Sequence, residues 1–463
     1  MTTAPARDRV AGVNARVPVL GGETRPCVNF DNAASTPPFQ SVLDAVTEFA
    51  PWYGNVHRGT GFKSRLSTWA YDESRATVAH WVGADAEHDV VLFMRNATEG
   101  LNRVARRFPF APDAIVLTTL MEHHSNDLPW RRMARVVHVG VGQDGRLDEH
   151  ELRSRLREHA GRVALLAVTG ASNVTGIVNP VHTYARWAHE AGARIVVDAA
   201  QLAPHRAIEM RPGNDPEHLD FLAFSAHKMY APFGIGVLVG PRDVFAEGDP
   251  DHVGGGTVDS VDLDRVRWTA LPEREEAGTP CITGAVALGA AVREYEAIGW
   301  TRINSHEARL TRHALEVLGA IPGLTLYGDA DPTRAADRLG VVAFNLESLP
   351  HGLVAAVLAH EWGIATRDGC FCAHPYVKAL LGVDDAASHQ IEERIAQGDR
   401  SDLPGAVRVS LGLYNTIQEI DVLGEALRAV AAGRHERDYV LDPHRGEYLP
   451  AGYSERFTEY WSV

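Results

Sequence analysis

The alternation of short apolar segments with helical segments is the feature that most limits how this chain can fold. Several of the apolar segments lack the polar alternation of a half-exposed strand. Runs of this kind are typical of strands buried on both faces of a mostly parallel sheet. Seven strands are predicted, at residues 90–95, 114–120, 135–141, 163–169, 194–198, 219–225 and 235–240.

Helical patterns between these strands, for example at 98–107 and 182–190, predict a doubly wound α/β domain. After Pro280 the pattern changes to a smaller α+β domain. Its predicted elements are helices at 284–298, 305–318 and 353–362 and a strand at 340–346.

The predicted organisation has three parts. Residues 1–27 form an N-terminal arm packing with the small domain, residues 28–290 the large domain, and residues 291–463 the small C-terminal domain. A polar, charged insertion near 380–404 is expected at the surface, partly helical around 390–396. It is either a solvated excursion or a lid or partner loop.

Charge and composition exclude several classes of protein. The chain has 463 residues and a formal net charge of −15, which argues against nucleic acid as the main partner. Apolar runs are too short for a membrane span, and the first residues lack the apolar core of a signal peptide. Four cysteines are too few for a disulfide scaffold, so a reduced protein is expected, and its expected location is the cytoplasm. Cys27 and Cys281 are expected to be thiols of the hydrophobic core.

Polar residues follow five of the predicted strands, where parallel sheets bind ligands. Lys228, with Ser225 and His227 beside it, could form a Schiff base or simply be a surface lysine. Asp198 ends a strand and could keep a pyridine nitrogen protonated, or could cap a helix.

The other three strand ends carry Thr98, His123 and Asn173. Thr98 opens a helix, where a phosphate would bind well, although an ordinary helix cap has the same pattern. His123 offers a flat ring that could stack on a cofactor. Five independent coincidences explain these strand ends less well than one shared site.

Together with further motifs, these residues resemble the class V aminotransferase family of pyridoxal-phosphate enzymes, in its cysteine desulfurase and selenocysteine lyase branch. The resemblance runs in order from about residue 28 to about 430. It is carried by Asp31-Asn32-Ala33-Ala34-Ser35-Thr36-Pro37, Val56-His57-Arg58-Gly59, Ala97-Thr98-Glu99-Gly100, Glu122-His123-His124, Ser172-Asn173, Asp198-Ala199-Ala200-Gln201, Ser225-Ala226-His227-Lys228, Ala277-Gly278-Thr279-Pro280 and Arg408-Val409-Ser410.

The resemblance implies fold type I, pyridoxal 5'-phosphate as cofactor, an amino-acid substrate and a homodimer with a composite site. Lys228 would hold the cofactor and move the proton at the substrate Cα, Asp198 would pair with the ring nitrogen, and His123 would stack on the ring. Other implied roles are Gln201 and Asn173 near the ring hydroxyl, Thr98, Ser225 and His227 at the phosphate, Thr279 at the partner's phosphate, and Arg408 with Asn32 at the substrate.

The segment 367–375 resembles the cysteine loop of the family and selects Cys372 as the nucleophile. Cys370 and Phe371 stand where this branch commonly has two histidines, and the segment from Cys372 to Arg408 is longer than expected. Cys370 is interpreted as a buried or resolving thiol. A disulfide with Cys372 or a metal site are the alternatives, and no metal site is expected because only His374 is nearby.

The predicted function is removal of sulfur from L-cysteine or a cysteine-derived substrate through a Cys372 persulfide, giving alanine, with a possible sulfur-acceptor protein. Selenocysteine, which would lose selenium instead of sulfur, stays open as an alternative substrate. One alternative is a C–S lyase, epimerase or aminotransferase of the same family in a specialised biosynthetic pathway. Another is a non-catalytic sulfur carrier or scaffold. The presence of Lys228, Asp198 and Arg408 argues against a non-catalytic protein.

Overall fold

The computed structural model describes residues 4–347, 349–436, 438–454 and 457–462. Its centre is a seven-stranded sheet in the order β4-β10-β9-β8-β7-β5-β6. Strand β10 runs antiparallel to both of its neighbours, β4 and β9, and the remaining pairs of the sheet are parallel. The strands are β4 (Asp89–Met94), β5 (Ile115–Thr119), β6 (Arg135–Val139), β7 (Val163–Thr169), β8 (Arg194–Asp198), β9 (Phe221–Ser225) and β10 (Gly236–Pro241).

Both faces of this sheet are buried, which explains the apolar strands. Along β9, Leu222 and Phe224 belong to one core cluster, and Phe221 and Ala223 belong to the cluster on the opposite face. Helix α3 packs on β9 and β10 on one side, while α5 packs on β8. The helices of this part are α1 (Gln40–Phe49), α2 (Phe62–Trp81), α3 (Ala97–Arg107), α4 (Glu149–Glu158), α5 (Val181–Glu190), α6 (Arg242–Ala246) and α7 (Ile282–Ile298).

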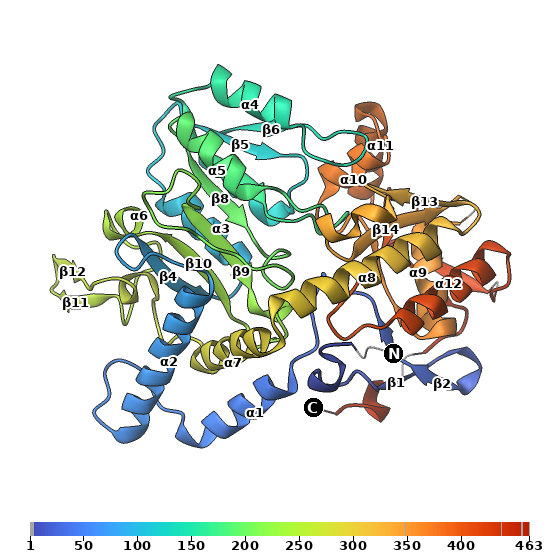
Figure 1. The fold of residues 1–463 in the computed structure, drawn as a ribbon, viewed down its shortest axis with the longest axis horizontal. Helices are drawn as coiled ribbons and strands as arrows, with labels where there is room; N and C mark the ends of the chain where they lie inside the picture. Colours follow the sequence, from blue (N-terminus) through green and yellow to red (C-terminus); the bar gives the residue numbers. More distant parts are fainter. Residues whose placement is uncertain (1–3, 348, 437, 455–456, 463) are drawn as a thin grey trace.

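A second core lies around a four-stranded sheet of order β13-β14-β17-β16. Helix α8 (Trp300–Gly319) spans the two parts (Figure 1), with Ile303 in the first core and Leu310 in the second. The remaining elements here are β13 (Leu324–Tyr327), β14 (Val341–Leu346), α9 (His351–Trp362), β15 (Ile364–Ala365), β16 (Arg367–Gly369), α10 (His374–Leu380), α11 (Asp385–Ala396), β17 (Ala406–Ser410) and α12 (Ile417–Ala431).

The N-terminal segment contacts both parts. Arg7 pairs with Glu419 of α12 at 2.7 Å, whereas Ala6 and Val10 join the core of the large sheet. Strand β3 (Val28–Asn29) pairs with β15. Hairpins β1 (Arg16–Pro18) with β2 (Thr24–Pro26), β11 (Val258–Val261) with β12 (Val266–Trp268) and β18 (Tyr439–Asp442) with β19 (Glu447–Pro450) complete the described elements.

The predicted seven-stranded α/β architecture with a smaller α+β part is confirmed. The predicted boundary between residues 290 and 291 falls inside α7, which packs on α1 and α2. The expectation for Cys281 is wrong, because this residue is exposed, and Cys27 is only half-buried. Among the described residues, no helix has both the length and the apolar character that crossing a membrane requires.

Candidate active site

A cavity of about 240 Å³ opens where the parallel strands end. Asp198 is the last residue of β8, Ser225 the last of β9, and Lys228 closes the single helical turn that follows. Thr98 comes from the first turn of α3, and His123 follows β5. Ten of the twelve residues predicted for the site line this one cavity: Thr98, His123, Asn173, Asp198, Gln201, Ser225, His227, Lys228, Cys372 and Arg408.

The amine of Lys228 lies in a desolvated setting. Burial lowers its pKa to about 8, and the negative charge of Asp198 only partly opposes that change. The cationic side chains of Arg408 and Arg367 act in the same direction as burial. A lysine whose pKa lies close to neutrality is suited to form a Schiff base.

Asp198 is a buried carboxylate without a salt bridge to any described residue. Its Oδ1 accepts one hydrogen bond, from the Ala200 N–H at 3.0 Å, and burial raises the pKa of the carboxyl. Gln201 donates to the Ala33 carbonyl at 2.7 Å, but no described residue donates a hydrogen bond to its buried Oε1. Two polar groups that line the cavity are therefore incompletely satisfied by the protein itself.

His123 is held as a neutral ring. Its Nδ1 accepts the Ser125 N–H at 3.1 Å, which places the ring proton on Nε2. Burial, and then the charge of Lys228, lower the pKa of His123 to about 3. Behind it, burial raises the pKa of Glu122 to about 8, and this side chain accepts the Thr169 N–H at 3.0 Å.

The start of α3 supplies the polar end of the cavity. Asn96 caps the helix by accepting the Glu99 N–H at 2.9 Å, and Ser225 Oγ accepts the Ala97 N–H at 2.8 Å. The Thr98 hydroxyl lies 2.7 Å from Ser125 Oγ. His227 adds a second ring, and burial lowers its pKa to about 4. A helix N-terminus with hydroxyl groups beside it favours an anionic group.

Cys372 reaches the cavity from the small sheet through a tight turn. The Ala373 N–H donates to the Cys370 carbonyl at 2.8 Å, and both central residues are left-handed, with φ of 52° at Phe371 and 55° at Cys372. Such a turn normally carries glycine or asparagine. Here it is held from outside, since Cys372 O accepts the His124 N–H at 2.7 Å and Phe371 O accepts from Asn173 at 2.8 Å.

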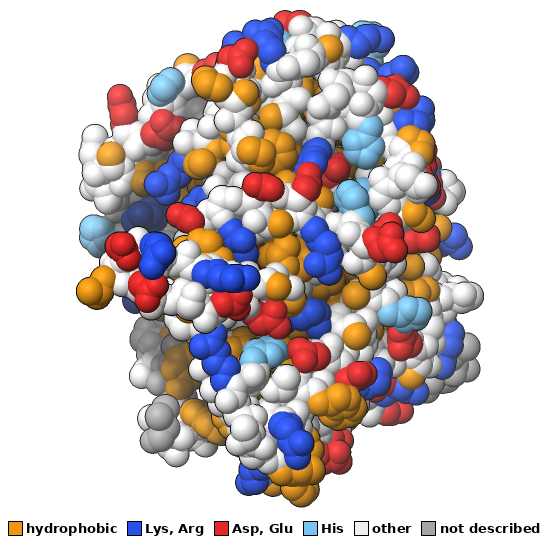
Figure 2. All heavy atoms as spheres, turned by 90° about the vertical axis from the view of Figure 1, so that its left-hand side faces the viewer, with side chains coloured by type: hydrophobic (Ala, Val, Ile, Leu, Met, Phe, Trp, Pro, Cys, Tyr) orange, Lys and Arg blue, Asp and Glu red, His pale blue; other side chains and the backbone are white. Residues whose placement is uncertain are grey.

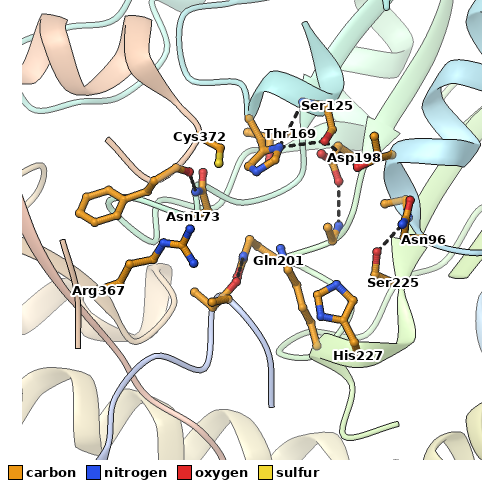
Figure 3. A pocket seen from close by; sticks show the side chains of 18 of the residues that line it. Asn96, Ser125, Thr169, Asn173, Asp198, Gln201, Ser225, His227, Arg367 and Cys372 are labelled. Carbon is orange, nitrogen blue, oxygen red and sulfur yellow. Dashed lines mark hydrogen bonds between the residues drawn. The ribbon is translucent and has the colours of Figure 1, made fainter. Parts of the chain in front are cut away.

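Two arginines form the cationic wall of the cavity. Arg408 is buried, pairs with Asp31 at 2.7 Å, donates to the Asn173 carbonyl at 3.0 Å and stacks over Phe371. Arg367 also lines the cavity. Figure 3 shows Arg367 and Cys372 on one side and Ser225 and His227 on the other.

Two predicted residues lie elsewhere in this single chain. Asn32 is buried behind the cavity wall, where its amide donates to Ser410 O at 2.9 Å and accepts from the Tyr414 hydroxyl at 2.7 Å. Thr279 lines a separate surface cavity with His57 and Arg58.

Cys370 does not line the cavity of Lys228 but a neighbouring cavity of about 490 Å³ that the insertion borders. Its thiol donates to the Pro404 carbonyl at 3.0 Å, and burial raises its pKa to about 11. All four cysteines are free in the structure.

Sequence reasoning missed Arg367, Ser125 and Thr169 as cavity-lining residues. Ser125 lies two residues after His123, and Thr169 lies four residues before Asn173. This closeness to predicted residues could have indicated that both line the cavity. Arg367 belongs to the segment recognised as a cysteine loop, but its orientation depends on the pairing of β16 with β17.

Comparisons with known proteins agree with this geometry. Residues 28–423 match the family model for aminotransferase class-V. A probable cysteine desulfurase of Halalkalibacterium halodurans is 36% identical over 423 residues, which cover 89% of this chain and 95% of that protein. A cysteine desulfurase of Haloferax volcanii is 34% identical, over 88% of this chain and 90% of that protein.

Solved structures show the same similarity. The apo structure of a cysteine desulfurase from Thermococcus onnurineus superposes with a TM-score of 0.77 and 33% identity, covering 88% of this chain and 95% of that one. A cysteine desulfurase from Escherichia coli gives a TM-score of 0.75 and 27% identity, over 94% of this chain and all of the other.

Proposed function

Because the chain belongs to the class-V aminotransferase family, within its cysteine desulfurase group, we propose that it takes sulfur from L-cysteine onto Cys372 and releases alanine. The observation that carries the proposal is the shared cavity: Cys372, Lys228 and Asp198 line the same 240 Å³ space although they come from distant parts of the chain.

The side chains around this space fit pyridoxal 5'-phosphate. The Asp198 carboxylate, which forms no salt bridge with a described residue, is suited to pair with a protonated ring nitrogen. The Gln201 Oε1, which accepts no hydrogen bond from the described residues, is available to a donor near the ring. Thr98, Ser225 and His227 line the end suited to a phosphate, and the neutral ring of His123 suits stacking. When bound, pyridoxal phosphate draws electrons from the bonds at the substrate Cα.

The protein's own groups then have defined tasks. Lys228 would hold the cofactor through its aldehyde and would carry the proton of the substrate Cα. The cationic wall of Arg408 and Arg367 binds the substrate carboxylate, for which guanidinium geometry is well suited. Cys372 would attack the substrate sulfur as a thiolate, so that an S–S bond forms while the substrate Cβ–S bond breaks. The electron pair of the broken bond stays with Cβ, which takes up a proton to become the methyl group of alanine. The sulfur stays on Cys372 as a persulfide.

The same proposal includes a homodimer, a sulfur-acceptor protein and a cytoplasmic location. Thr279, outside the cavity of its own chain, would complete the site of a partner subunit. Helix α11, close in sequence to the cysteine loop, has no buried residue and offers a surface to an acceptor. A reducing compartment keeps thiols such as the four free cysteines reduced.

The test is to incubate the purified enzyme with L-cysteine and identify both products. Alanine together with a protein persulfide is expected, and Cys372→Ala should abolish the persulfide while keeping the cofactor absorption band. Pyruvate and ammonia would indicate a β-eliminating lyase, and unchanged sulfide release by Cys372→Ala would overturn the role of this thiol.

A further inference from the structure

A second cluster of ionisable side chains lies at the opposite edge of the large sheet from Lys228. It consists of His88 and Asp89, at the beginning of β4, and His218, just before β9. One ligand atom from each residue lies within 4.8 Å of the other two. Because β4 spans six residues, about 20 Å of strand separates this cluster from the cavity end of the sheet.

His218 has a buried nitrogen for which the residues that the structure describes provide no hydrogen-bond partner. The residue is 2% exposed, and its Nδ1 lies 2.7 Å from the Arg211 carbonyl. A carbonyl only accepts, so the ring proton is on Nδ1 and the lone pair is on Nε2. Nε2 has no hydrogen-bond partner within the described part of the chain and lies 3.7 Å from Asp89 Oδ1, too far for a hydrogen bond.

Asp89 brings a carboxyl group to the same point. Its side chain is 1% exposed, and Oδ2 accepts the Asp85 N–H at 2.9 Å, which fixes the carboxylate plane. Oδ1 is directed to both histidines, with His88 Nδ1 at 2.8 Å and His218 Nε2 at 3.7 Å. A lone pair on His218 and a carboxylate oxygen thus face each other.

His88 completes the set and leaves a route to solvent. Its side chain is 38% exposed, and its ring lies edge-on to that of His218, with centroids 4.9 Å apart. The backbone N–H of His88 donates to the Asp85 carbonyl at 3.1 Å, so the turn that carries it is ordered. An ion could enter past His88 and keep a water molecule at the exposed side.

We propose that His88 Nδ1, Asp89 Oδ1 and His218 Nε2 bind one divalent transition-metal ion of the Zn²⁺ type. Two imidazoles and one carboxylate are ligands that Zn²⁺ prefers, with water as the fourth. Ligating histidines usually donate their other N–H to a carbonyl or carboxylate, as His218 does to Arg211. The ion would connect the start of β4 to the segment that leads into β9.

The strained backbone at Arg211 supports a positioning role for its carbonyl. Arg211 is left-handed, with φ of 65°, and its guanidinium forms an ion pair with Glu217. Left-handed non-glycine residues are uncommon and persist where the surroundings hold them. Here the result is a carbonyl that fixes which nitrogen of His218 faces Asp89.

The test is a titration of the holoenzyme, full chain, with Co²⁺ followed by absorption and with Zn²⁺ followed by thermal unfolding. We expect one Co²⁺ site with a d–d band but no sulfur charge-transfer band, and a higher melting temperature with Zn²⁺. His88→Gln and His218→Gln should each weaken binding about 100-fold or more, because even an outer-shell partner is worth about 10–100-fold.

His88→Gln changes a partly exposed side chain, so it keeps the test valid if His218→Gln does not fold. The matched control is His150→Gln, an exposed histidine on α4, which should bind the ions as the wild type does. Wild-type affinity in both cluster variants would overturn the proposal. A sulfur charge-transfer band that disappears in Cys372→Ser, with no other cobalt signal, would also overturn it and assign the metal to the active-site thiol. Neither result would bear on the desulfurase proposal.

Discussion

Among single residues, Lys228 shows most directly how burial prepares a side chain for chemistry. Only the neutral amine attacks an aldehyde, and burial lowers the pKa of this amine to about 8. The neutral fraction therefore grows as the pH rises toward 8 and then levels off. An ordinary lysine, with a pKa near 10.4, would remain almost fully protonated over the same range.

We therefore predict a pH dependence for cofactor reloading. After removal of the cofactor, the rate at which added pyridoxal phosphate restores the visible absorption band should rise about tenfold per pH unit below pH 8 and level off above it. Stopped-flow absorbance measures this rate, and Lys228→Ala should show no band at any pH. A rate that continues to rise up to pH 10 would contradict the lowered pKa.

The two neighbouring thiols should differ sharply in function. Cys370 donates to the Pro404 carbonyl, and burial raises its pKa to about 11, so little of it is thiolate near neutral pH. Cys370→Ala should therefore leave the yield of persulfide nearly unchanged and cost about 1 kcal/mol of stability through the lost hydrogen bond. Persulfide labelling and thermal unfolding measure the two effects. A larger loss of persulfide in Cys370→Ala than in Cys372→Ala would reverse their assigned roles.

At the scale of elements, the central sheet could be predicted because burial on both faces leaves a clear pattern in the sequence. All seven predicted strands are present, and β7 and β8 have the predicted bounds. The antiparallel direction of β10 could not be predicted, since a strand buried on both faces looks the same in either direction. Hairpin β11–β12 was missed because its residues are largely exposed and carry no periodic apolar pattern.

A close contact between two elements gives the third prediction. Gly236 of β10 lies against the backbone that leads into α3, and an added Cβ would be 2.6 Å from Asn96 Cα and 2.8 Å from Phe224 O. Backbone atoms cannot move aside as a side-chain end can, so Gly236→Ala should displace the N-terminus of α3. Affinity for pyridoxal phosphate should fall, as measured by fluorescence titration of the cofactor-free protein.

Gly100 in α3 is the matched control for this substitution. A Cβ there would meet Leu238 Cβ at 3.4 Å and Ala223 Cβ at 3.6 Å, which are ordinary contacts. Gly100→Ala should keep cofactor affinity and add up to about 1 kcal/mol of helix stability. Equal cofactor affinities in the two variants would show that the fit at Gly236 does not control the phosphate end of the site.

At the scale of the whole molecule, the active site was predictable where the chain itself brings residues to one sheet edge. Asp198 and Ser225 end neighbouring strands, so their proximity follows from the topology. The contribution of Arg367 depends on how the small sheet docks, and the His88–Asp89–His218 cluster joins segments far apart in the sequence. No local pattern reports such contacts. The family resemblance supplied Cys372, whereas periodicity alone did not.

The segments around the cavity of Thr279 carry exposed apolar side chains, which supports the proposal of a subunit interface there. Figure 2 looks onto the side that carries the β11–β12 hairpin, where hydrophobic side chains lie among charged ones. Large apolar residues are exposed on the segments flanking the cavity of Thr279, namely Trp52, Tyr53, Phe62, Trp69, Val253, Val261, Leu263 and Val266. Concentrations of exposed apolar side chains are typical of interaction surfaces.

If each site is built from two chains, as proposed, two different inactive variants should complement each other in a mixed dimer. Lys228→Ala removes the amine, and Thr279→Asp places a negative charge where the partner's phosphate is proposed to bind, so each variant alone should be nearly inactive. In a mixed dimer, the chain with Thr279→Asp still has its Lys228, and the chain with Lys228→Ala still has its Thr279. These two unchanged residues would together form one intact site. Unfolding and refolding the two variants together should therefore recover alanine production well above that of either alone.

The amount of recovered activity shows whether Thr279 belongs to the site of the partner chain or to the site of its own chain. Random pairing yields mixed dimers for about half of the population, so about a quarter of all sites should be intact. The control is each variant refolded separately and combined immediately before the assay, so that no mixed dimers form during refolding. If Thr279 instead served its own chain, the mixed dimer would hold no complete site, and co-refolding would recover no activity.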